Sequence, residues 1–332
     1  MAGRAAGDGG RPGRGLTVRA AVIAGPGSVE LASVPTPAPG AGEVLIEIEG
    51  CGVCGSDLPV WQGRPWFEYP REPGRPGHEG WGRIAAVGDG VRDLPVGTRV
   101  AAMSFAADAE FDVAAADAVV PLPDALAGQP FPGEALGCAM NVARRCAFAE
   151  GQTVAIVGAG FLGALLVQLA ARAGTTVIAI SRRPFAREVA QRMGAHHVLG
   201  LDEDAAGRVE ELTAGALCDR VIEVTGRQEP LDLAGRLCRV RGRLVIAGFH
   251  QDGPRQVDMQ LWNWRGLDVI NAHERDPQIY VRGMREAVDA VACGRLDPSP
   301  LYTHEFPLER IGDAFATASE RPDGFLKALV RP

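Results

Sequence analysis

The sequence predicts an α/β protein with two parts, one irregular and mostly β, the other built on a doubly wound parallel sheet. Short apolar segments broken by glycine and proline run from about Thr17 to Pro123, which is typical of an irregular β structure. From Gln152 onward, apolar strands alternate with segments of helical periodicity, which indicates a parallel sheet covered on both faces. The 332 residues, of which 46% are hydrophobic, are enough to form two separate cores.

The first part is expected to contain three well-marked strands and a closing helix. The segments 18–25, 42–50 and 81–88 are apolar or alternating, and turn residues bound each of them. A helix is expected near Gly133–Glu150. The residues from Leu296 onward revert to strand-like and loop character, so we expect this part to be built from both ends of the chain.

The second part is expected to hold strands joined by helices. The expected strands are 153–160, 176–180, 196–200, 219–226, 243–249 and 267–273, and the clearest helices are 161–174, 184–195, 203–215 and 280–293. This number of strands, about six, fits the doubly wound fold that binds dinucleotides.

Composition and charge exclude several classes of function. A formal net charge of −7 argues against nucleic acid as the main partner, because phosphate binding needs a basic surface. No apolar run reaches the ~20 residues of a membrane span. Segment 1–16 is rich in glycine and arginine and lacks the apolar centre of a secretory signal. We therefore expect a disordered tail over 1–16 and a cytoplasmic protein. The seven cysteines are an odd number thinly spread, which does not fit a disulfide framework and leaves clustered thiols as metal-binding candidates.

A G-x-G-x-x-G motif runs from Gly158 through Gly160, Phe161 and Leu162 to Gly163. It follows an apolar strand and opens an apolar helix, the setting in which this motif marks a dinucleotide site. The three glycines would permit a tight turn, close approach of a pyrophosphate and close helix packing, respectively. The helix N-terminus would offer free N–H groups to the phosphates. The alternative is three ordinary glycines in a turn.

The end of the second expected strand lacks the acidic residue that usually binds the ribose hydroxyl. Ser181, Arg182 and Arg183 stand there instead. A hydroxyl and two guanidinium groups would bind a 2′-phosphate, which a carboxylate would repel. We therefore predict that NADP(H) is favoured over NAD(H). The alternative is that both arginines are solvated charges at a helix start.

Three separated segments carry candidate metal ligands. Cys51 and Cys54 form a C-x-x-C, His78 lies in a Gly-His-Glu segment, and Cys138 follows a Leu-Gly pair. Taken singly, each segment has an ordinary alternative. The C-x-x-C is a redox pair or a pair of zinc ligands, His78 is a lone histidine with its hydrogen bonds made, and Cys138 is a small core residue. Together, ahead of a dinucleotide fold, they match the two thiolates and one imidazole of a catalytic zinc site with an open fourth position.

The motifs CGVCGSD, PGHEGWG, EALGC and GAGFLG, in this order, resemble the zinc-containing medium-chain dehydrogenase/reductase superfamily, which includes alcohol, sorbitol and threonine dehydrogenases. The resemblance extends from about Arg19 to Val330. It implies a mostly β GroES-like catalytic domain over 17–145 and 294–332 and a dinucleotide-binding Rossmann domain over 146–293.

The resemblance also implies the ligands of one catalytic zinc ion. These are Cys54, His78 and Cys138, while Cys51 is implied to be a packed neighbour. Glu79 matches a family glutamate that lies near the metal and can replace water as a ligand.

Two further carboxylates match family positions near the metal. Asp57 matches one that orients a metal ligand from behind. Glu134 matches the acidic position that sorbitol-type members place close to the metal. Because the chain has both Glu134 and Cys138, the exact ligand set stays open.

The implied reaction is transfer of a hydride between an alcohol or polyol, or the matching aldehyde or ketone, and NADP(H) or NAD(H), with zinc polarising the substrate oxygen. Ser56 matches the hydroxyl that starts the proton relay, although a capping serine is the alternative. Pro59 occupies the position of the relay histidine of liver-type members, so the rest of the relay must differ.

Other assignments concern the substrate and cofactor pockets. Trp61 and Trp66 stand where the family places pocket walls, with ordinary core aromatics as the alternative. His273 follows an expected strand at the edge where the nicotinamide would lie. Lys327 could contact a cofactor phosphate, but we expect it to be exposed.

The segment from Val100 to Pro121 has no cysteine, whereas many members carry a second, structural zinc there. We therefore predict one zinc ion per chain. A homodimer through the sheet edge of the nucleotide domain is expected, with a tetramer as the alternative. Competing functions are a zinc-free quinone or enoyl reductase, a non-catalytic nucleotide-binding protein, and a redox-active Cys51–Cys54 pair.

Overall fold

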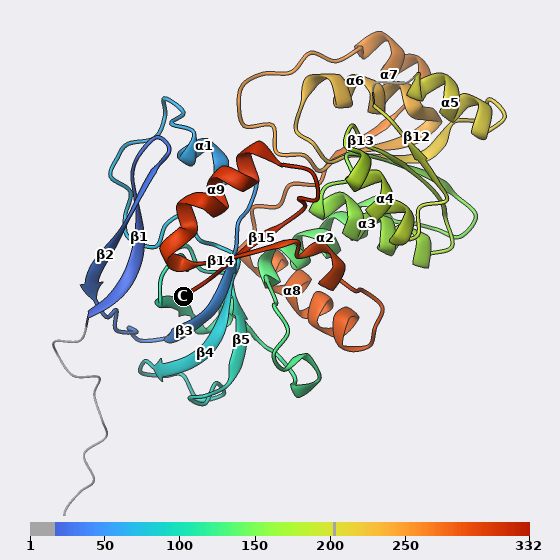
Figure 1. The fold of residues 1–332 in the computed structure, drawn as a ribbon. Helices are drawn as coiled ribbons and strands as arrows, with labels where there is room; N and C mark the ends of the chain where they lie inside the picture. The colour runs from blue at the N-terminus through green and yellow to red at the C-terminus, as the bar shows by residue number, and fades with distance from the viewer. Residues whose placement is uncertain (1–16, 202–203) are drawn as a thin grey trace, which may run out of the picture.

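The computed structural model of the chain describes residues 17–201 and 204–332, so the tail predicted over 1–16 lies outside the described residues. Two large sheets and a separate two-stranded hairpin organise these residues (Figure 1). The first has six parallel strands in the order β10-β9-β8-β11-β12-β13. Their bounds are β8 Thr153–Val157, β9 Thr176–Ile180, β10 His197–Leu199, β11 Cys218–Glu223, β12 Cys238–Ile246 and β13 Asp268–Asn271. This is the predicted doubly wound sheet, and the predicted fold class is confirmed.

Helices cover both faces of the parallel sheet. On β8, Val154 and Ile156 pack into one core, while Ala155 and Val157 pack into another, because successive side chains point to opposite faces of a strand. The first core includes residues of α2, α3, α4 and α8, and the second includes residues of α5 and α6. The helix bounds are α2 Gly133–Cys146, α3 Phe161–Arg172, α4 Pro184–Arg192, α5 Ala205–Leu212, α6 Gln228–Leu237, α7 Met259–Arg265 and α8 Pro277–Ala292.

The second sheet uses both ends of the chain. Its strands run in the order β14-β15-β3-β4-β5-β7, with β6 paired to β3, and a separate hairpin joins β1 to β2. The bounds are β1 Thr17–Gly25, β2 Ser28–Pro35, β3 Glu43–Gly52, β4 Gly80–Val87, β5 Arg99–Ala102, β6 Phe111–Ala115, β7 Val119–Pro121, β14 His304–Pro307 and β15 Ala328–Arg331. The C-terminal strand β15 pairs antiparallel with β3, with Leu329 opposite Gly52. The last residues therefore lie beside the segment that carries the first candidate metal ligand.

Helix α2 crosses α8 at very short range. A β-carbon on Gly137 would lie 2.7 Å from the backbone nitrogen of Met284, and one on Gly283 would lie 2.5 Å from the carbonyl oxygen of Gly137. Only glycine allows so close an approach of the two backbones. This contact fixes α2 between the two sheets, where it can present side chains to a site between them.

The C-terminal region contains a helix that was not predicted from the sequence. The region after Leu296 was expected to be strand-like or loop, but Ile311–Glu320 forms α9. Its buried residues Ile311, Ala314, Phe315 and Ala318 are spaced by three or four, which is a helical period that the flanking strands obscured. Helix α8 also starts earlier than expected, at Pro277, because Asp276 caps it by accepting from the N–H of Gln278. Within the described residues, no helix is both long and apolar enough to cross a bilayer.

Candidate metal and cofactor site

Antiparallel pairing of β3 and β4 brings the first candidate ligands together. Cys51 on β3 lies opposite Gly80 on β4, so the segment just after β3 meets the segment just before β4. Cys54 follows the first strand, while His78 and Glu79 precede the second. One potential ligand atom from each of Cys54, His78 and Glu79 lies within 4.8 Å of the others. Two chain segments 24 to 25 residues apart thus supply sulfur, nitrogen and oxygen donors to one point.

Helix α2 brings two more candidate residues to this point. Glu134 and Cys138 lie one helical turn apart and therefore share a face of the helix. Oε2 of Glu134 is 4.0 Å from Nε2 of His78. Burial, followed by the nearby Glu134, Cys54 and Glu79, raises the pKa of the Cys138 thiol well above its usual value. These neighbours place Cys138 beside the cluster, although its sulfur is not one of the three atoms grouped most tightly.

The ring of His78 has a defined orientation. Its Nδ1 lies 3.1 Å from Oδ1 of Asp57 and 3.0 Å from the carbonyl oxygen of Pro76. The other carboxylate oxygen of Asp57 accepts a 2.8 Å hydrogen bond from the backbone N–H of Cys54. Asp57 therefore ties together the segments that carry Cys54 and His78. With Nδ1 as the donor, Nε2 is left as a free lone pair directed toward the cluster, the arrangement usual for a metal-binding imidazole.

Lys327 corrects the expectation of an exposed side chain. It is 4% exposed, and its Nζ lies 2.7 Å from Oε1 and 2.5 Å from Oε2 of the fully buried Glu79. Burial alone would lower the pKa of Lys327, but Glu79 and Cys54 outweigh this effect and raise it. Its Nζ also lies 4.9 Å from the centre of the Phe161 ring, a cation–π distance. Lys327 therefore links the metal cluster to the first residue of α3.

The donor set fits a zinc ion. Two thiols, one imidazole and two carboxylates surround this point, and Lys327 is the cation directly paired with them. Burial raises the pKa of Glu134 to about 7, because a carboxylate removed from water carries its negative charge at a cost. A divalent cation would offset that charge, and mixed sulfur and nitrogen donors are those that zinc prefers.

The glycine motif has the geometry that its predicted roles require. Gly158 has a φ of +112°, which favours glycine. A β-carbon on Gly163 would lie 1.9 Å from the carbonyl oxygen of Gly158, so α3 packs directly on the turn. Gly160 is the N-cap of α3, and a β-carbon there would meet nothing within 4 Å. The backbone at Gly160 is thus open to an approaching pyrophosphate.

Ser181, Arg182 and Arg183 lie at the carboxyl end of β9, and their side chains differ in setting. Ser181 is buried, and its carbonyl oxygen accepts a 3.0 Å hydrogen bond from Arg187. Arg182 is exposed and lies 3.7 Å from Glu229. Arg183 donates across to the carbonyl oxygen of Phe325, in the loop that leads to Lys327. The three residues do not form one cluster, but all lie at the edge where a doubly wound fold binds its ligand.

The remaining predicted residues fall into different surroundings. His273 is exposed and stacks on Phe249, with ring centres 5.1 Å apart. Trp61 stacks on Phe315 of α9 at 5.5 Å, within a hydrophobic cluster, which favours the core-aromatic alternative for this tryptophan. Trp66 is 53% exposed. Ser56 lies in the turn between Cys54 and Asp57 and is partly exposed.

Two buried carboxylates near the site were not predicted. Glu223, at the end of β11, accepts from the N–H of Gly226 at 2.9 Å and lies 3.0 Å from Nε2 of His250. It thereby holds the loops that follow β11 and β12. Asp108 is 4% exposed, and burial, followed by the nearby Asp57, raises its pKa well above the usual range. No motif marks either residue. The position of Glu223 in an apolar strand was the one sequence feature that could have indicated a buried carboxylate.

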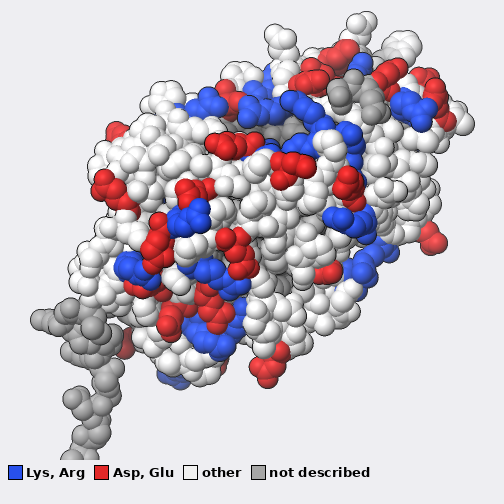
Figure 2. Space-filling model, viewed as in Figure 1, with Lys and Arg blue, Asp and Glu red and all other residues white. Residues whose placement is uncertain are grey.

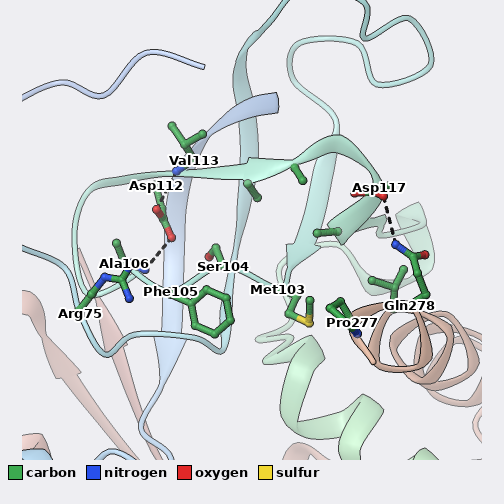
Figure 3. A pocket seen from close by; sticks show the side chains of 14 residues that line it. Arg75, Met103, Ser104, Phe105, Ala106, Asp112, Val113, Asp117, Pro277 and Gln278 are labelled. Carbon is green, nitrogen blue, oxygen red and sulfur yellow. Dashed lines mark hydrogen bonds between the residues drawn. The ribbon is translucent and has the colours of Figure 1, made fainter. Parts of the chain in front are cut away.

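A pocket of about 500 Å³ lies between residues 103–118 and the start of α8, and none of the predicted site residues lines it. Figure 3 shows Asp112 turned toward the backbone N–H of Ala106, and Asp117 bonded to Gln278. The carboxylates of Asp112 and Asp117 therefore both accept hydrogen bonds from the protein. The pocket is separate from the candidate metal site.

Comparison with known families agrees with these observations. Residues 40–164 match the alcohol dehydrogenase GroES-like domain family, and residues 162–289 match the zinc-binding dehydrogenase family. Among characterised relatives, sorbitol dehydrogenase of Bacillus subtilis is 27% identical over 95% of this chain and 97% of its own length. The 2-dehydro-3-deoxy-L-galactonate 5-dehydrogenase of Pseudoalteromonas atlantica is 27% identical over 88% of this chain and 92% of its own length.

Comparison with solved structures agrees with the family match. An Escherichia coli alcohol dehydrogenase complexed with NADH aligns with a TM-score of 0.85 at 25% identity, over 96% of this chain and 100% of the other. A structure described as a zinc-binding dehydrogenase from Sinorhizobium meliloti, bound to NADP, aligns with a TM-score of 0.82 at 26% identity, over 95% and 99%. The chain therefore belongs to the zinc-type medium-chain dehydrogenase/reductase superfamily and is an oxidoreductase of the alcohol dehydrogenase type.

Proposed function

We propose that this protein is a zinc-dependent dehydrogenase that transfers a hydride between a polyol or related hydroxylated substrate and NADP(H). The observation that carries the proposal is the fixed orientation of His78. Asp57 holds Nδ1 at 3.1 Å, so Nε2 faces the point where Cys54 and Glu79 also converge. A histidine oriented by a carboxylate beside a thiol is the arrangement of a metal ligand rather than of a solvated side chain.

Each residue has a proposed part in the reaction. A bound zinc ion would supply the Lewis acidity that polarises the substrate oxygen, and a bound nicotinamide would exchange the hydride. Cys54, His78 and Cys138 would hold the metal, with Glu79 or Glu134 available as a further oxygen ligand. Ser56 would take the hydroxyl proton at its Oγ and release it toward solvent, because its side chain is partly exposed.

The substrate class is proposed from relatives and from the polarity of the site. The curated relatives include sorbitol dehydrogenases and dehydrogenases of galactonate derivatives, which act on chains of hydroxyl groups. Glu134 and Ser56 offer hydrogen-bonding groups near the candidate metal ligands. Such groups suit a substrate with a second hydroxyl beside the reacting one. A spectrophotometric screen of simple alcohols, polyols and sugar acids tests this; turnover of simple alcohols alone would contradict it.

The cofactor preference is proposed from the end of β9. Arg182 and Arg183 lie where the ribose 2′ position would be, and no carboxylate follows the strand. We expect wild-type enzyme to saturate at lower NADPH than NADH concentration. Arg182→Gln should raise the KM for NADPH roughly tenfold, since one charge-assisted hydrogen bond is lost, and should leave the KM for NADH nearly unchanged.

Arg192→Gln is the matched control, because Arg192 is an exposed arginine in the last turn of the adjoining helix α4. It should change neither KM. Equal or better use of NADH by the wild-type enzyme would refute the proposed preference.

We further propose a homodimer formed through β13. Within the described residues this strand pairs with β12 on one side only, and its Val269 is 40% exposed. Next to it, Met259 and Trp264 of α7 are 52% and 87% exposed. An unpaired edge beside exposed apolar side chains suits two-fold strand pairing. Sedimentation velocity should give twice the chain mass, and Val269→Lys should shift it toward the monomer; a wild-type monomer would refute the dimer.

The proposal includes one zinc ion per chain and a cytoplasmic location. The segment between β5 and β7 carries no cysteine, so it offers no thiolates for a second, structural site. Metal analysis that finds two zinc ions per chain would refute this part.

A further inference from the structure

The edge of the parallel sheet carries two arginines on either side of the glycine motif. Strands β9, β8 and β11 are neighbours in that order. Arg183 follows β9 and Arg227 follows β11, while Gly158 follows β8 between them. Arg227 pairs with Asp252 at 3.3 Å, and Arg183 donates to the carbonyl oxygen of Phe325.

A third arginine approaches from the other part of the molecule. Arg321 is the C-cap of α9, with a left-handed backbone at φ 51°. The loop it begins runs toward the parallel sheet (Figure 1), and the contact of Phe325 with Arg183 docks that loop on the carboxyl end of β9. Arg321 therefore lies at the start of a loop that joins the second sheet's part of the chain to the end of β9.

Arg321 lies close to both other arginines. Burial and then the neighbouring Arg321 lower the pKa of Arg183. Burial and then the neighbouring Arg227 lower the pKa of Arg321 itself. Arg183 and Arg227 follow the two strands that flank β8, so a side chain near both lies at the edge of the sheet where the glycine motif follows β8.

Among residues 17–201 and 204–332, no acidic side chain forms an ion pair with Arg321, and its guanidinium makes one hydrogen bond, from Nε to the carbonyl oxygen of Ala318 at 3.4 Å. Figure 2 shows basic side chains along the upper rim of a hollow near the ends of α9 and α6, with acidic side chains along its lower rim. Of the three guanidinium groups, only that of Arg227 forms an ion pair within the described residues, with Asp252, while Asp323 lies near Arg183. An anion that binds between the three groups would reduce their mutual repulsion.

We propose that Arg321 is a cofactor-binding residue that reaches from the catalytic part of the chain and binds phosphate oxygens of the dinucleotide between Arg183 and Arg227. The inference rests on the proposed nicotinamide dinucleotide. Its ligand chemistry is a phosphate oxygen, which the bridging pyrophosphate or a 2′-phosphate can supply. Cofactor binding would then join the two parts of the molecule directly, since one guanidinium contacts a ligand held by the other part.

The test compares wild type with Arg321→Gln, with NADPH and NADH Kd measured by nicotinamide fluorescence and with the Tm of the cofactor-free protein. Glutamine is also an unbranched residue with a β-carbon, so the left-handed backbone is no more strained than before. We expect Kd to rise roughly 10- to 100-fold, the value of a charge-assisted hydrogen bond. The Tm of the cofactor-free protein should be unchanged or higher, because a like charge has been removed. Arg310→Gln, at the other end of α9 and paired with Asp313 at 2.7 Å, should leave every Kd unchanged.

The arms of the experiment identify the phosphate. A loss shared by NADPH and NADH assigns Arg321 to the pyrophosphate, and a loss confined to NADPH assigns it to the 2′-phosphate; both bear out the inference. Wild-type affinity in Arg321→Gln would overturn it, and so would a fall in Tm without a change in Kd. If wild-type protein itself binds neither dinucleotide, the proposed function fails together with this inference.

Discussion

Replacement of His78 by alanine is expected to abolish zinc binding at the candidate site and to lower kcat/KM by at least about 10³-fold, since metal polarisation of a substrate oxygen contributes several kcal/mol. The imidazole is the only nitrogen donor in the cluster with Cys54 and Glu79. Without it, the thiols and carboxylates would face one another with little to compensate their charge. Metal analysis and steady-state kinetics on the same sample measure both effects.

Asp57→Asn provides a graded version of this prediction. Asparagine has nearly the same shape, but it removes the negative charge that faces Nδ1 of His78 at 3.1 Å. Metal affinity should fall roughly 10- to 100-fold, the usual effect of losing a carboxylate behind a histidine ligand. His197→Ala, an exposed histidine on the far strand β10, is the control and should change neither zinc content nor kcat/KM. Full zinc occupancy in His78→Ala would show that the ligands lie elsewhere.

Lys327→Met is expected to destabilise the protein by about 3–5 kcal/mol, because it leaves a buried carboxylate without its partner. Glu79 is fully buried, and both of its oxygens lie within 2.7 Å of the Lys327 ammonium. Urea unfolding of metal-free protein, followed by circular dichroism, measures the loss.

The double variant Lys327→Met/Glu79→Gln separates loss of the pair from loss of packing. Removing the charge of Glu79 as well should recover much of the stability, so the two single effects should not add. Lys327→Arg keeps the positive charge and tests whether the shape of the cation matters. Lys327 is the only lysine in the sequence, and a planar guanidinium needs more room than the compact ammonium that fits between Glu79 and Phe161. Strictly additive single effects would contradict the account of Glu79 and Lys327 as a buried pair.

The sequence predicted those features that depend on local pattern. The glycine motif could be interpreted because three glycines lie at fixed offsets between an apolar strand and an apolar helix, and Gly158 and Gly163 have the backbone geometry this requires. A role for Asp57 behind a metal ligand followed from the family resemblance, and the structure places His78 beside it. In both cases the informative residues lie within one or two short segments, where spacing alone carries the signal.

The features that were missed depend on tertiary docking. The ion pair of Lys327 with Glu79 joins residues 248 positions apart, and it forms only because β15 pairs with β3. The sequence feature that could have indicated this ion pair is a lone lysine inside the apolar run from Phe325 to Val330. Arg321 shows the same limit: its neighbours Arg183 and Arg227 belong to the parallel sheet, so nothing in its local sequence indicates what it faces.

The most direct test of the account is the dependence of turnover on zinc, measured as zinc per chain and NADP-linked polyol oxidation on the same preparation. The candidate ligands converge on a single point, so the account predicts one zinc ion per active chain. Activity should fall in proportion to the zinc removed by a chelator and return when zinc is restored. Full activity in a preparation that contains no zinc would contradict the central claim.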